Sequence, residues 1–376
     1  MYRQLLIRSI GILLASTILA NCISSKQHPT TPGYTTQEET RSYFPTDAWR
    51  ISTPEEQGMR SENLNAMLAL IREKDYKIDS VSIVRNGHLI LDIYFQPFKQ
   101  GDKHVIHSCT KSVVSTLIGI AIQAGYIESI DVTVLDFFPD KDIKNIDPNK
   151  RSITLGDLLI MGSGIRCRDS YLYDWQGLRA MMKNPDWVEY FLSLPMEVPP
   201  GSKFEYCNSG SYTLSAILQK TTGMTTLQFA RQYLFDPLGI QDVDWPESSE
   251  GINYGWGEMS LNPQDMAKIG YLYLNGGRWA EQQVIPETWV EAATSPQIHA
   301  GTLSNDYGYQ WWVDRGGYYM ALGYAGQYII VVPDQDLVVI FTSALNEQDF
   351  FVPEILFNEY ILRAIRSETG YMETHC

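Results

Sequence analysis

Ser108 and Lys111 stand three residues apart at the start of a strongly apolar run in this 376-residue chain. Residues three apart share one face of a helix, so the lysine amine is expected beside the serine hydroxyl. A serine becomes nucleophilic when a neighbour takes its proton, and lysine does so when burial disfavours its ammonium form. In the alternative interpretation Ser108 only caps the helix and Lys111 is solvated. The apolar run 113–122 favours the first interpretation, because it predicts a buried helix.

A second candidate pair, Tyr206 and Asn208, follows a loop that begins at Pro199. Tyrosine acts as a base only if nearby cations lower its pKa from about 10, and Lys111 is expected to do so. The amide of Asn208 is suited to hydrogen-bond both the lysine and a substrate. The same pattern at Tyr273–Asn275 ends an apolar segment, where it is interpreted as a core tyrosine and a helix cap.

A third candidate stretch runs into a predicted strand at Gln327, after a turn bracketed by Gly323 and Gly326. Glycines at such a turn let a substrate approach the backbone closely. A backbone N–H at the edge of a strand can also stabilise an oxyanion.

In this order, the three stretches resemble the motifs of the serine β-lactamase and penicillin-binding-protein superfamily. The class C branch, with its esterases, D-aminopeptidases and nylon-oligomer hydrolases, uses Tyr-x-Asn as second motif and is the best match. Further stretches similar to this branch are "DLLIMGSGI", "YGWGEMSLNPQDMAKIGYLYLNGG" and "YGYQWWV". The resemblance extends from about Asp47 to Ser367 and implies a β-lactamase/transpeptidase-like fold of the α/β (α+β) class.

Carried over to this chain, the resemblance implies a role for each residue. Ser108 would be the acylated nucleophile, Lys111 its proton acceptor and Tyr206 the acid/base for the leaving group. Asn208 would orient the substrate, and the backbone N–H groups of Ser108 and Gln327 would form the oxyanion hole. Whether Lys111 or Tyr206 first removes the serine proton stays open, and no cofactor or metal is implied.

The third motif departs from the family pattern, because Tyr324-Ala325-Gly326 stands where Lys-Thr-Gly is usual. In β-lactamases and D-Ala-D-Ala peptidases that motif helps to hold the substrate carboxylate. The sequence therefore predicts an esterase-like serine hydrolase for a small ester or amide. The alternatives are a true class C-type β-lactamase or D-peptidase, and a non-catalytic cell-envelope binding protein. The sequence lacks Gly-x-Ser-x-Gly and His-Glu-x-x-His, which disfavours a Ser-His-Asp hydrolase and a metallohydrolase.

The first 22 residues predict a bacterial secretory signal peptide. Arg3 and Arg8 flank the start of the apolar run "IGILLASTILA", which is too short to span a bilayer. The following Leu19–Cys22 resembles a lipobox, so Cys22 is predicted to be lipidated. Residues 23–46 are expected to form a polar tether and residues 47–376 the hydrolase domain. The protein is thus expected to be exported, as a periplasm-facing lipoprotein or a periplasmic protein, with the lipid as its only membrane anchor.

Composition excludes other classes. With 44% hydrophobic and 19% charged residues the chain is expected to be globular, and its formal net charge of −15 disfavours nucleic-acid partners. The remaining cysteines, at positions 109, 167, 207 and 376, show no zinc spacing or disulfide framework. They are interpreted as small buried hydrophobic residues, with a bridge among some of them left open.

Secondary-structure patterns predict which helices and strands position the three candidate stretches. Asn86-Gly87 predicts a hairpin within residues 80–96, and Pro333-Asp334 a second one within 327–343. Helical spacing marks residues 353–367, and helices are expected to stop at glycines 125, 164 and 276. The expected architecture is an antiparallel sheet built from both termini, flanked by helices, with a mainly helical insertion. Aromatic clusters at Tyr173–Trp175, Trp256 and Tyr309–Trp312 are candidates for pocket walls or for core packing.

Overall fold

A nine-stranded sheet joins the two ends of the domain, as the sequence predicts. The computed structural model describes residues 43–170, 173–301 and 305–366. Neighbouring described strands are antiparallel except β1 and β3, which are parallel. The order across the sheet is β1 (Arg50–Ile51), β3 (His88–Tyr94), β2 (Ile78–Arg85), β13 (Leu337–Ser343), β12 (Gln327–Val332), β11 (Tyr319–Gly323), β10 (Trp312–Asp314), β9 (Asn305–Tyr307) and β8 (Ile298–His299).

Both predicted hairpins are present. Between β2 and β3, Asn86 and Gly87 take left-handed φ values of 49° and 74°, which suit a two-residue turn. Between β12 and β13 the chain makes a 3₁₀ turn, η4 (Pro333–Gln335), and closes with Asp336 at a φ of 46°. The second hairpin places β12, which begins at the third candidate stretch, in the middle of the sheet.

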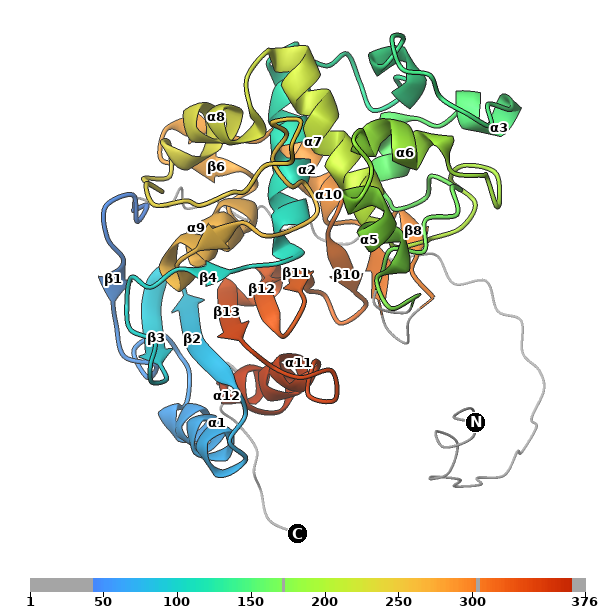
Figure 1. Ribbon diagram of the computed structural model, residues 1–376. Coiled ribbons are helices and arrows are strands. Elements are labelled where there is room, and N and C mark those ends of the chain that lie inside the picture. The colour runs from blue at the N-terminus through green and yellow to red at the C-terminus, as the bar shows by residue number, and fades with distance from the viewer. Residues whose placement is uncertain (1–42, 171–172, 302–304, 367–376) are drawn as a thin grey trace, which may run out of the picture. The chain divides into compact units, whose positions relative to one another are not determined.

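Side chains alternate between the two faces of the sheet, so each face has its own core. In β13, Leu337, Val339 and Phe341 belong to one core, while Val338 and Ile340 belong to the other. The first face packs against α1 (Ser61–Glu73) and the C-terminal helix, as Figure 1 shows. That helix is the predicted one and comprises α11 (Val352–Leu356), a π-helical turn η5 (Phe357–Ile361) and α12 (Leu362–Ala364).

The second face is covered by α9 (Pro263–Leu274) and by the inserted helical region, in which α2 (Cys109–Gln123) packs against α7 (Asn208–Thr222). The helices end near glycines 125 and 276 as predicted, but α4 (Leu155–Leu159) stops well before Gly164, and Met161 takes a φ of 57°. The other inserted elements are β4 (His104–Val105), η1 (Val134–Phe137), α3 (Pro148–Arg151), α5 (Gln176–Met182), α6 (Trp187–Ser193), α8 (Thr226–Ala230), η3 (Arg231–Phe235), β5 (Ser260–Leu261), β6 (Arg278–Trp279), β7 (Gln282–Gln283) and α10 (Glu287–Ala293).

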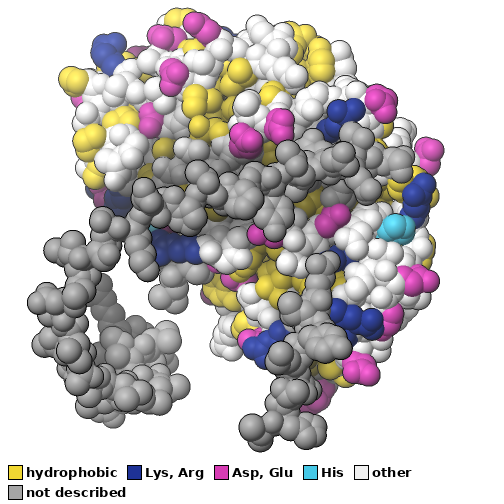
Figure 2. Space-filling model, turned by 180° about the vertical axis from the view of Figure 1, so that it is seen from behind, with side chains coloured by type: hydrophobic (Ala, Val, Ile, Leu, Met, Phe, Trp, Pro, Cys, Tyr) yellow, Lys and Arg dark blue, Asp and Glu magenta, His cyan; other side chains and the backbone are white. Residues whose placement is uncertain are grey.

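The described chain begins inside the segment that the sequence assigns to the tether. The ring of Phe44 lies 5.5 Å from that of Trp279, and the carbonyl of Thr46 accepts a 3.1 Å hydrogen bond from Lys268. The predicted signal peptide, its lipidation site Cys22 and the terminal Cys376 lie outside the described residues. No helix in the described ranges is both long and apolar enough to cross a membrane. On the described part of the face in Figure 2, acidic and basic side chains are interspersed.

Helix α9 approaches the sheet closely at Gly270, which generates a prediction about stability. A Cβ atom there would lie 2.6 Å from Val338 Cγ1 and 2.9 Å from Ile329 Cγ2. We expect Gly270→Ala to lower the free energy of unfolding by about 1 kcal/mol, because overpacking outweighs the better helix propensity of alanine. Gly210→Ala, where the nearest atom would be 3.6 Å away, is the matched control and should not destabilise. Denaturant unfolding of both variants measures the difference, and a Gly270→Ala protein as stable as the parent would contradict the packing argument.

Candidate active site

Ser108 immediately precedes α2 and is positioned by a short two-stranded ladder. β4 pairs with β5, and the N–H of Ile106 donates to the carbonyl of Met259 at 2.8 Å. His107 then takes a left-handed φ of 45°, an uncommon conformation for a residue with a side chain, and turns the chain into the helix. Ser108 is the N-cap residue, and its hydroxyl caps no helical N–H, so it is available for other contacts. N–H groups in the first turn of a helix have no acceptor within the helix.

Lys111 lies one helical turn further on, beside Ser108, as the spacing predicts. Its Nζ is 3.0 Å from Ser108 Oγ, 2.7 Å from Asn208 Oδ1 and 2.6 Å from the carbonyl oxygen of Trp256. Only 1% of the side chain is exposed. Burial lowers the pKa of Lys111 to about 7, although the negative charges of Asp169 and Glu258 act in the opposite direction. A large fraction of this amine is therefore neutral near neutral pH.

Tyr206 also belongs to this cluster, but its protonation differs from the expectation. Lys111 Nζ lies 4.8 Å from the centre of the Tyr206 ring. Burial raises the pKa of Tyr206 above its ordinary value, and this effect exceeds the lowering by a hydrogen bond with Ser108. The expectation that Lys111 lowers the pKa of this tyrosine is therefore wrong, because desolvation of the phenolate dominates.

Asn208 connects Lys111 to a carboxylate that the sequence argument missed. Besides accepting from Lys111, its amide donates through Nδ2 to the carbonyl oxygen of Asp169 at 2.7 Å. The Asp169 carboxylate is completely buried and accepts from the N–H groups of Asn208 and Ser209 and from the Ser209 hydroxyl. Asn208 opens α7, so Asp169 lies at the N-terminus of that helix, where negative charge is favoured.

The third candidate stretch lies next to the start of α2. Cys109 Sγ is 3.5 Å from the carbonyl oxygen of Gln327, the first residue of β12. Gly323 is required for packing, because a Cβ atom there would lie 2.4 Å from the carbonyl oxygen of Ile106. Gly326 is required by its φ of 91°. These two glycines thus let the hairpin fit against the segment before Ser108, a reason that differs from the predicted approach of substrate.

Aromatic side chains surround this cluster on two sides. The ring of Tyr324 lies 5.8 Å from His107, 5.7 Å from Trp175 and 5.9 Å from Phe350, measured between ring centres. On the other side Trp312 stacks on Tyr206 at 6.3 Å. The residues of the predicted aromatic cluster 309–312 therefore have different roles. Trp312 lies beside Tyr206, whereas the adjacent Trp311 is fully buried in the core.

A disulfide bond joins Cys167 to Cys207 across 40 residues. The favoured interpretation of these residues as unpaired hydrophobic cysteines is thus wrong for this pair, while Cys109 is free and buried as expected. With Asp169 they form a group of potential metal ligands, but both sulfur atoms are used in the bridge. Both carboxylate oxygens of Asp169 already accept hydrogen bonds. The bridge instead ties the segment before Asp169 to the residue before Asn208.

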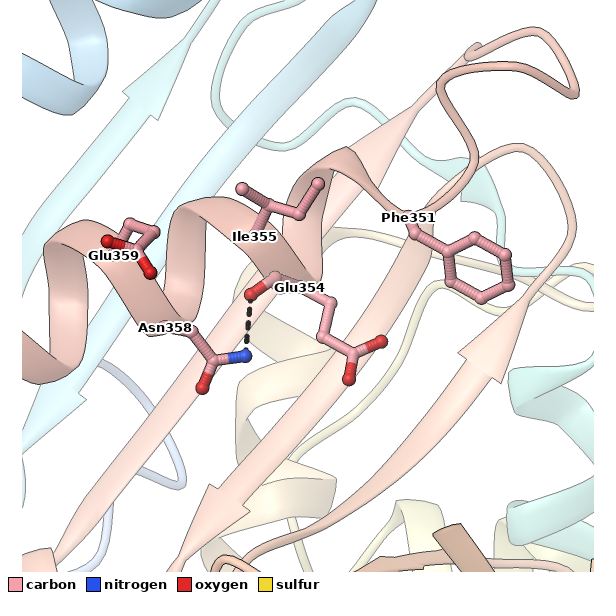
Figure 3. Close-up of a pocket in the computed structure, with 5 residues that line it drawn as sticks. All are labelled: Phe351, Glu354, Ile355, Asn358 and Glu359. Atoms are coloured by element: carbon pink, nitrogen blue, oxygen red, sulfur yellow. Dashed lines mark hydrogen bonds between the residues drawn. The ribbon is translucent and has the colours of Figure 1, made fainter. Parts of the chain in front are cut away.

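A surface hollow of about 330 Å³ lies on the C-terminal helix, and its lining residue Phe351 directly follows Phe350. Figure 3 shows its lining, in which Asn358 donates to the backbone carbonyl of Glu354 beside the exposed side chains of Phe351 and Ile355. Glu354 and Glu359 make the hollow acidic. It contains no serine, lysine or tyrosine among its lining residues, so the chemistry predicted from the sequence does not belong there.

Comparison with known proteins identifies similar sequences and similar folds. The beta-lactamase family model matches residues 66–356. The 6-aminohexanoate-dimer hydrolase of Paenarthrobacter ureafaciens is 22% identical over 79% of this chain and 81% of its own. The lovastatin esterase of Penicillium rubens is 31% identical over 38% of this chain and 37% of its own. The structure of a penicillin-binding protein homologue from Pyrococcus abyssi superposes with a TM-score of 0.65 at 18% identity, covering 82% of this chain and 78% of the other.

The chain belongs to the β-lactamase family of serine hydrolases. The predicted superfamily and the β-lactamase/transpeptidase-like fold are thereby confirmed.

The disulfide generates a prediction about stability. Closing a loop of 40 residues restricts the unfolded chain, which stabilises the folded protein by about 4 kcal/mol in the chain-entropy account. We expect dithiothreitol to lower the melting temperature of the parent protein clearly. A double variant, Cys167→Ala with Cys207→Ala, should melt at one temperature with and without reductant. If reductant leaves the parent's melting temperature unchanged, the bridge does not contribute in this way.

Proposed function

We propose that the protein hydrolyses a small, neutral ester or amide through an acyl-enzyme formed on Ser108. The observation that carries this proposal is the buried amine of Lys111, 3.0 Å from the hydroxyl of Ser108 and with a pKa lowered to about 7. Relatives named as an esterase and as a 6-aminohexanoate-dimer hydrolase support an acyl bond as the target.

In this proposal Lys111 is the base. A neutral amine has two hydrogens and one lone pair, whereas the ammonium has three hydrogens and cannot accept. Two of its three contacts, with Asn208 Oδ1 and the carbonyl of Trp256, are with acceptors and take the two hydrogens. The ammonium form of Lys111 donates to Ser108 Oγ at 3.0 Å. In the neutral form, the lone pair left over would face this oxygen and could accept the serine proton. Tyr206, with its raised pKa, keeps its proton at this stage.

The reaction then proceeds by ordinary acyl transfer. Ser108 Oγ bonds to the substrate carbonyl carbon while its proton moves to Lys111, and the oxyanion is stabilised by the N–H groups of Ser108 and Gln327. The leaving group departs after receiving a proton through Tyr206, which Lys111 replenishes. A water molecule then attacks the acyl-enzyme in the same way and gives its proton to Lys111. The acid product leaves, and the proton returns to Ser108 Oγ. Asn208 holds Lys111 in place throughout.

The electrostatics of the site favour substrates without a carboxylate. Tyr324 occupies the position of the usual third-motif lysine and is surrounded by aromatic rings. The charges that act on Lys111 include the carboxylates of Asp169 and Glu258. A negatively charged substrate would thus meet negative charge and lose a charge-assisted hydrogen bond, whereas a neutral acyl group would meet aromatic surface.

We also propose that the protein is exported. Disulfide bonds persist mainly in oxidising compartments, and the Cys167–Cys207 bridge supports the signal peptide predicted for residues 1–22. Lipidation at Cys22 would then hold the domain at the membrane surface through the segment that follows.

The nucleophile is tested by covalent labelling. We expect a fluorophosphonate to label the parent protein at Ser108 and the Ser108→Ala variant not at all. The labelling rate should rise as pH increases through about 7, because below its pKa Lys111 is protonated and cannot accept the serine proton. Mass spectrometry locates the adduct. Equal labelling of the alanine variant would refute the assignment of Ser108.

Substrate charge is tested by comparing nitrocefin, which carries a carboxylate, with p-nitrophenyl butyrate, which does not. We expect kcat/KM for nitrocefin to be at least about tenfold lower than for p-nitrophenyl butyrate, because the loss of one charge-assisted hydrogen bond weakens binding by about that factor. Tyr324→Lys should raise the nitrocefin value selectively and leave the butyrate value nearly unchanged. A parent protein that prefers nitrocefin would instead be a β-lactamase.

A further inference from the structure

Asp169 is a buried acidic residue to which the proposed reaction gives no role. Its side chain is completely inaccessible to solvent. Oδ1 accepts from the N–H of Asn208 at 2.8 Å, and Oδ2 accepts from the N–H and hydroxyl of Ser209 at 2.8 and 2.7 Å. Three donors that converge on one carboxyl group match its ionised form, because a protonated carboxyl would direct its own hydrogen at one of them. Burial raises the pKa of Asp169 above its ordinary value, while the hydrogen bonds from Ser209 and Asn208 and the charge of Lys111 act in the opposite direction. The three converging donors favour the carboxylate, and thus a negative charge at the start of α7.

The same residue fixes the orientation of the Asn208 amide through its backbone. Asn208 Nδ2 donates to the carbonyl oxygen of Asp169 at 2.7 Å, and Asn208 Oδ1 accepts from Lys111 at 2.7 Å. An amide that donates at one end must present its oxygen at the other. Asp169 thus determines that Lys111 meets an acceptor and not a donor.

We propose that Asp169 is a positioning residue for acylation, which holds Asn208 and Lys111 against Ser108 and sets with its buried charge how readily Lys111 releases its proton. This inference rests on the proposed function of Ser108 and Lys111. It adds a carboxylate to the machinery, one that acts through Asn208 and makes no contact with the substrate.

The charged and titratable groups around Lys111 come from several segments. Asp169 precedes α5, Glu258 precedes β5 and lies 3.4 Å from His107, Cys109 is in α2, and Tyr206 precedes α7. Among the carboxylates that favour the ammonium form of Lys111, Asp169 has a larger effect than Glu258. Burial raises the pKa of the Cys109 thiol, so that group stays uncharged near neutral pH. The greater weight of Asp169 over Glu258 follows from burial, since the Glu258 side chain is 37% exposed and water screens its charge.

Removal of this charge has a defined sign. Asp169→Asn takes away a negative charge that stabilises the ammonium form, so the pKa of Lys111 should fall and the acid limb of the acylation rate should move to lower pH. The amide of the new asparagine has only one acceptor oxygen, so its NH₂ group faces either Ser209 or the N–H of Asn208. One hydrogen bond is lost, and Asn208 is held less firmly. The plateau rate should therefore fall at the same time.

The experiment measures the rate of fluorophosphonate labelling at Ser108 across the neutral pH range, with the full-length protein. For Asp169→Asn we expect the acid limb about one pH unit lower and a plateau reduced on the order of tenfold. Asp169→Glu, which restores the charge, should return the limb toward that of the parent. Ser209→Ala removes the hydrogen bond that most lowers the pKa of Asp169, so its limb should move in the same direction as that of Asp169→Asn but by less. Melting temperatures of all variants are measured in parallel.

The outcomes separate the possibilities. In one outcome, Asp169→Asn leaves the acid limb of the labelling rate at the same pH and lowers the rate only in proportion to the folded fraction. Asp169 would then act only as a helix cap, and the proposal would be overturned. A larger shift in Glu258→Gln than in Asp169→Asn would also overturn it, because Glu258 would then be the dominant charge. A parent protein that is not labelled at Ser108 would refute the proposed function itself, irrespective of Asp169.

Discussion

The desolvation of one amine governs the arrangement of this site. Lys111 belongs to a helix whose residues are buried from Cys109 to Ala121, so its charge is deprived of water on all sides. A buried ammonium is costly, and the cost is reduced when the amine loses its proton or meets acceptors. The fold supplies both routes, since oxygen atoms of Ser108, Asn208 and Trp256 all lie within 3.0 Å of it. In the proposed mechanism, this environment makes a base of a side chain that elsewhere would be a solvated cation.

The elements that create this environment come from distant parts of the chain. Asn208 is 97 residues from Lys111 and Trp256 is 145 residues away. Their relative positions depend on helix packing in the insertion, where buried Gln310 donates to the backbone carbonyls of Leu158 and Leu159 and accepts from Ser211. Such a polar residue within a core specifies one packing arrangement, because any other would leave its amide unsatisfied. The disulfide between Cys167 and Cys207 adds a covalent restraint within the same inserted region.

In the proposed function, the reaction chemistry and the choice of substrate depend on different parts of the site. The polar cluster around Lys111 lies at the N-terminal ends of α2 and α7. The aromatic residues Trp175, Tyr324 and Phe350 come from loops and from the hairpin that follows β11. Loops vary more readily than packed helix ends, since fewer buried groups depend on them. This difference explains how the chain can have the serine, lysine, tyrosine and asparagine of the first two motifs and yet have Tyr324 in place of the usual lysine of the third motif.

Local physical rules were enough to predict much of the protein from its sequence. Helical periodicity puts Lys111 beside Ser108, the tolerance of Asn86 and Gly87 for positive φ makes a hairpin, and an all-round apolar run makes a buried helix. Tertiary structure alone decided the rest, because burial and backbone carbonyls from distant segments leave no local pattern. The sequence did not reveal that Cys167 pairs with Cys207 or that a carboxylate lies behind Asn208. It also gave the wrong direction for the pKa of Tyr206, since desolvation by the assembled core outweighs the nearest charge.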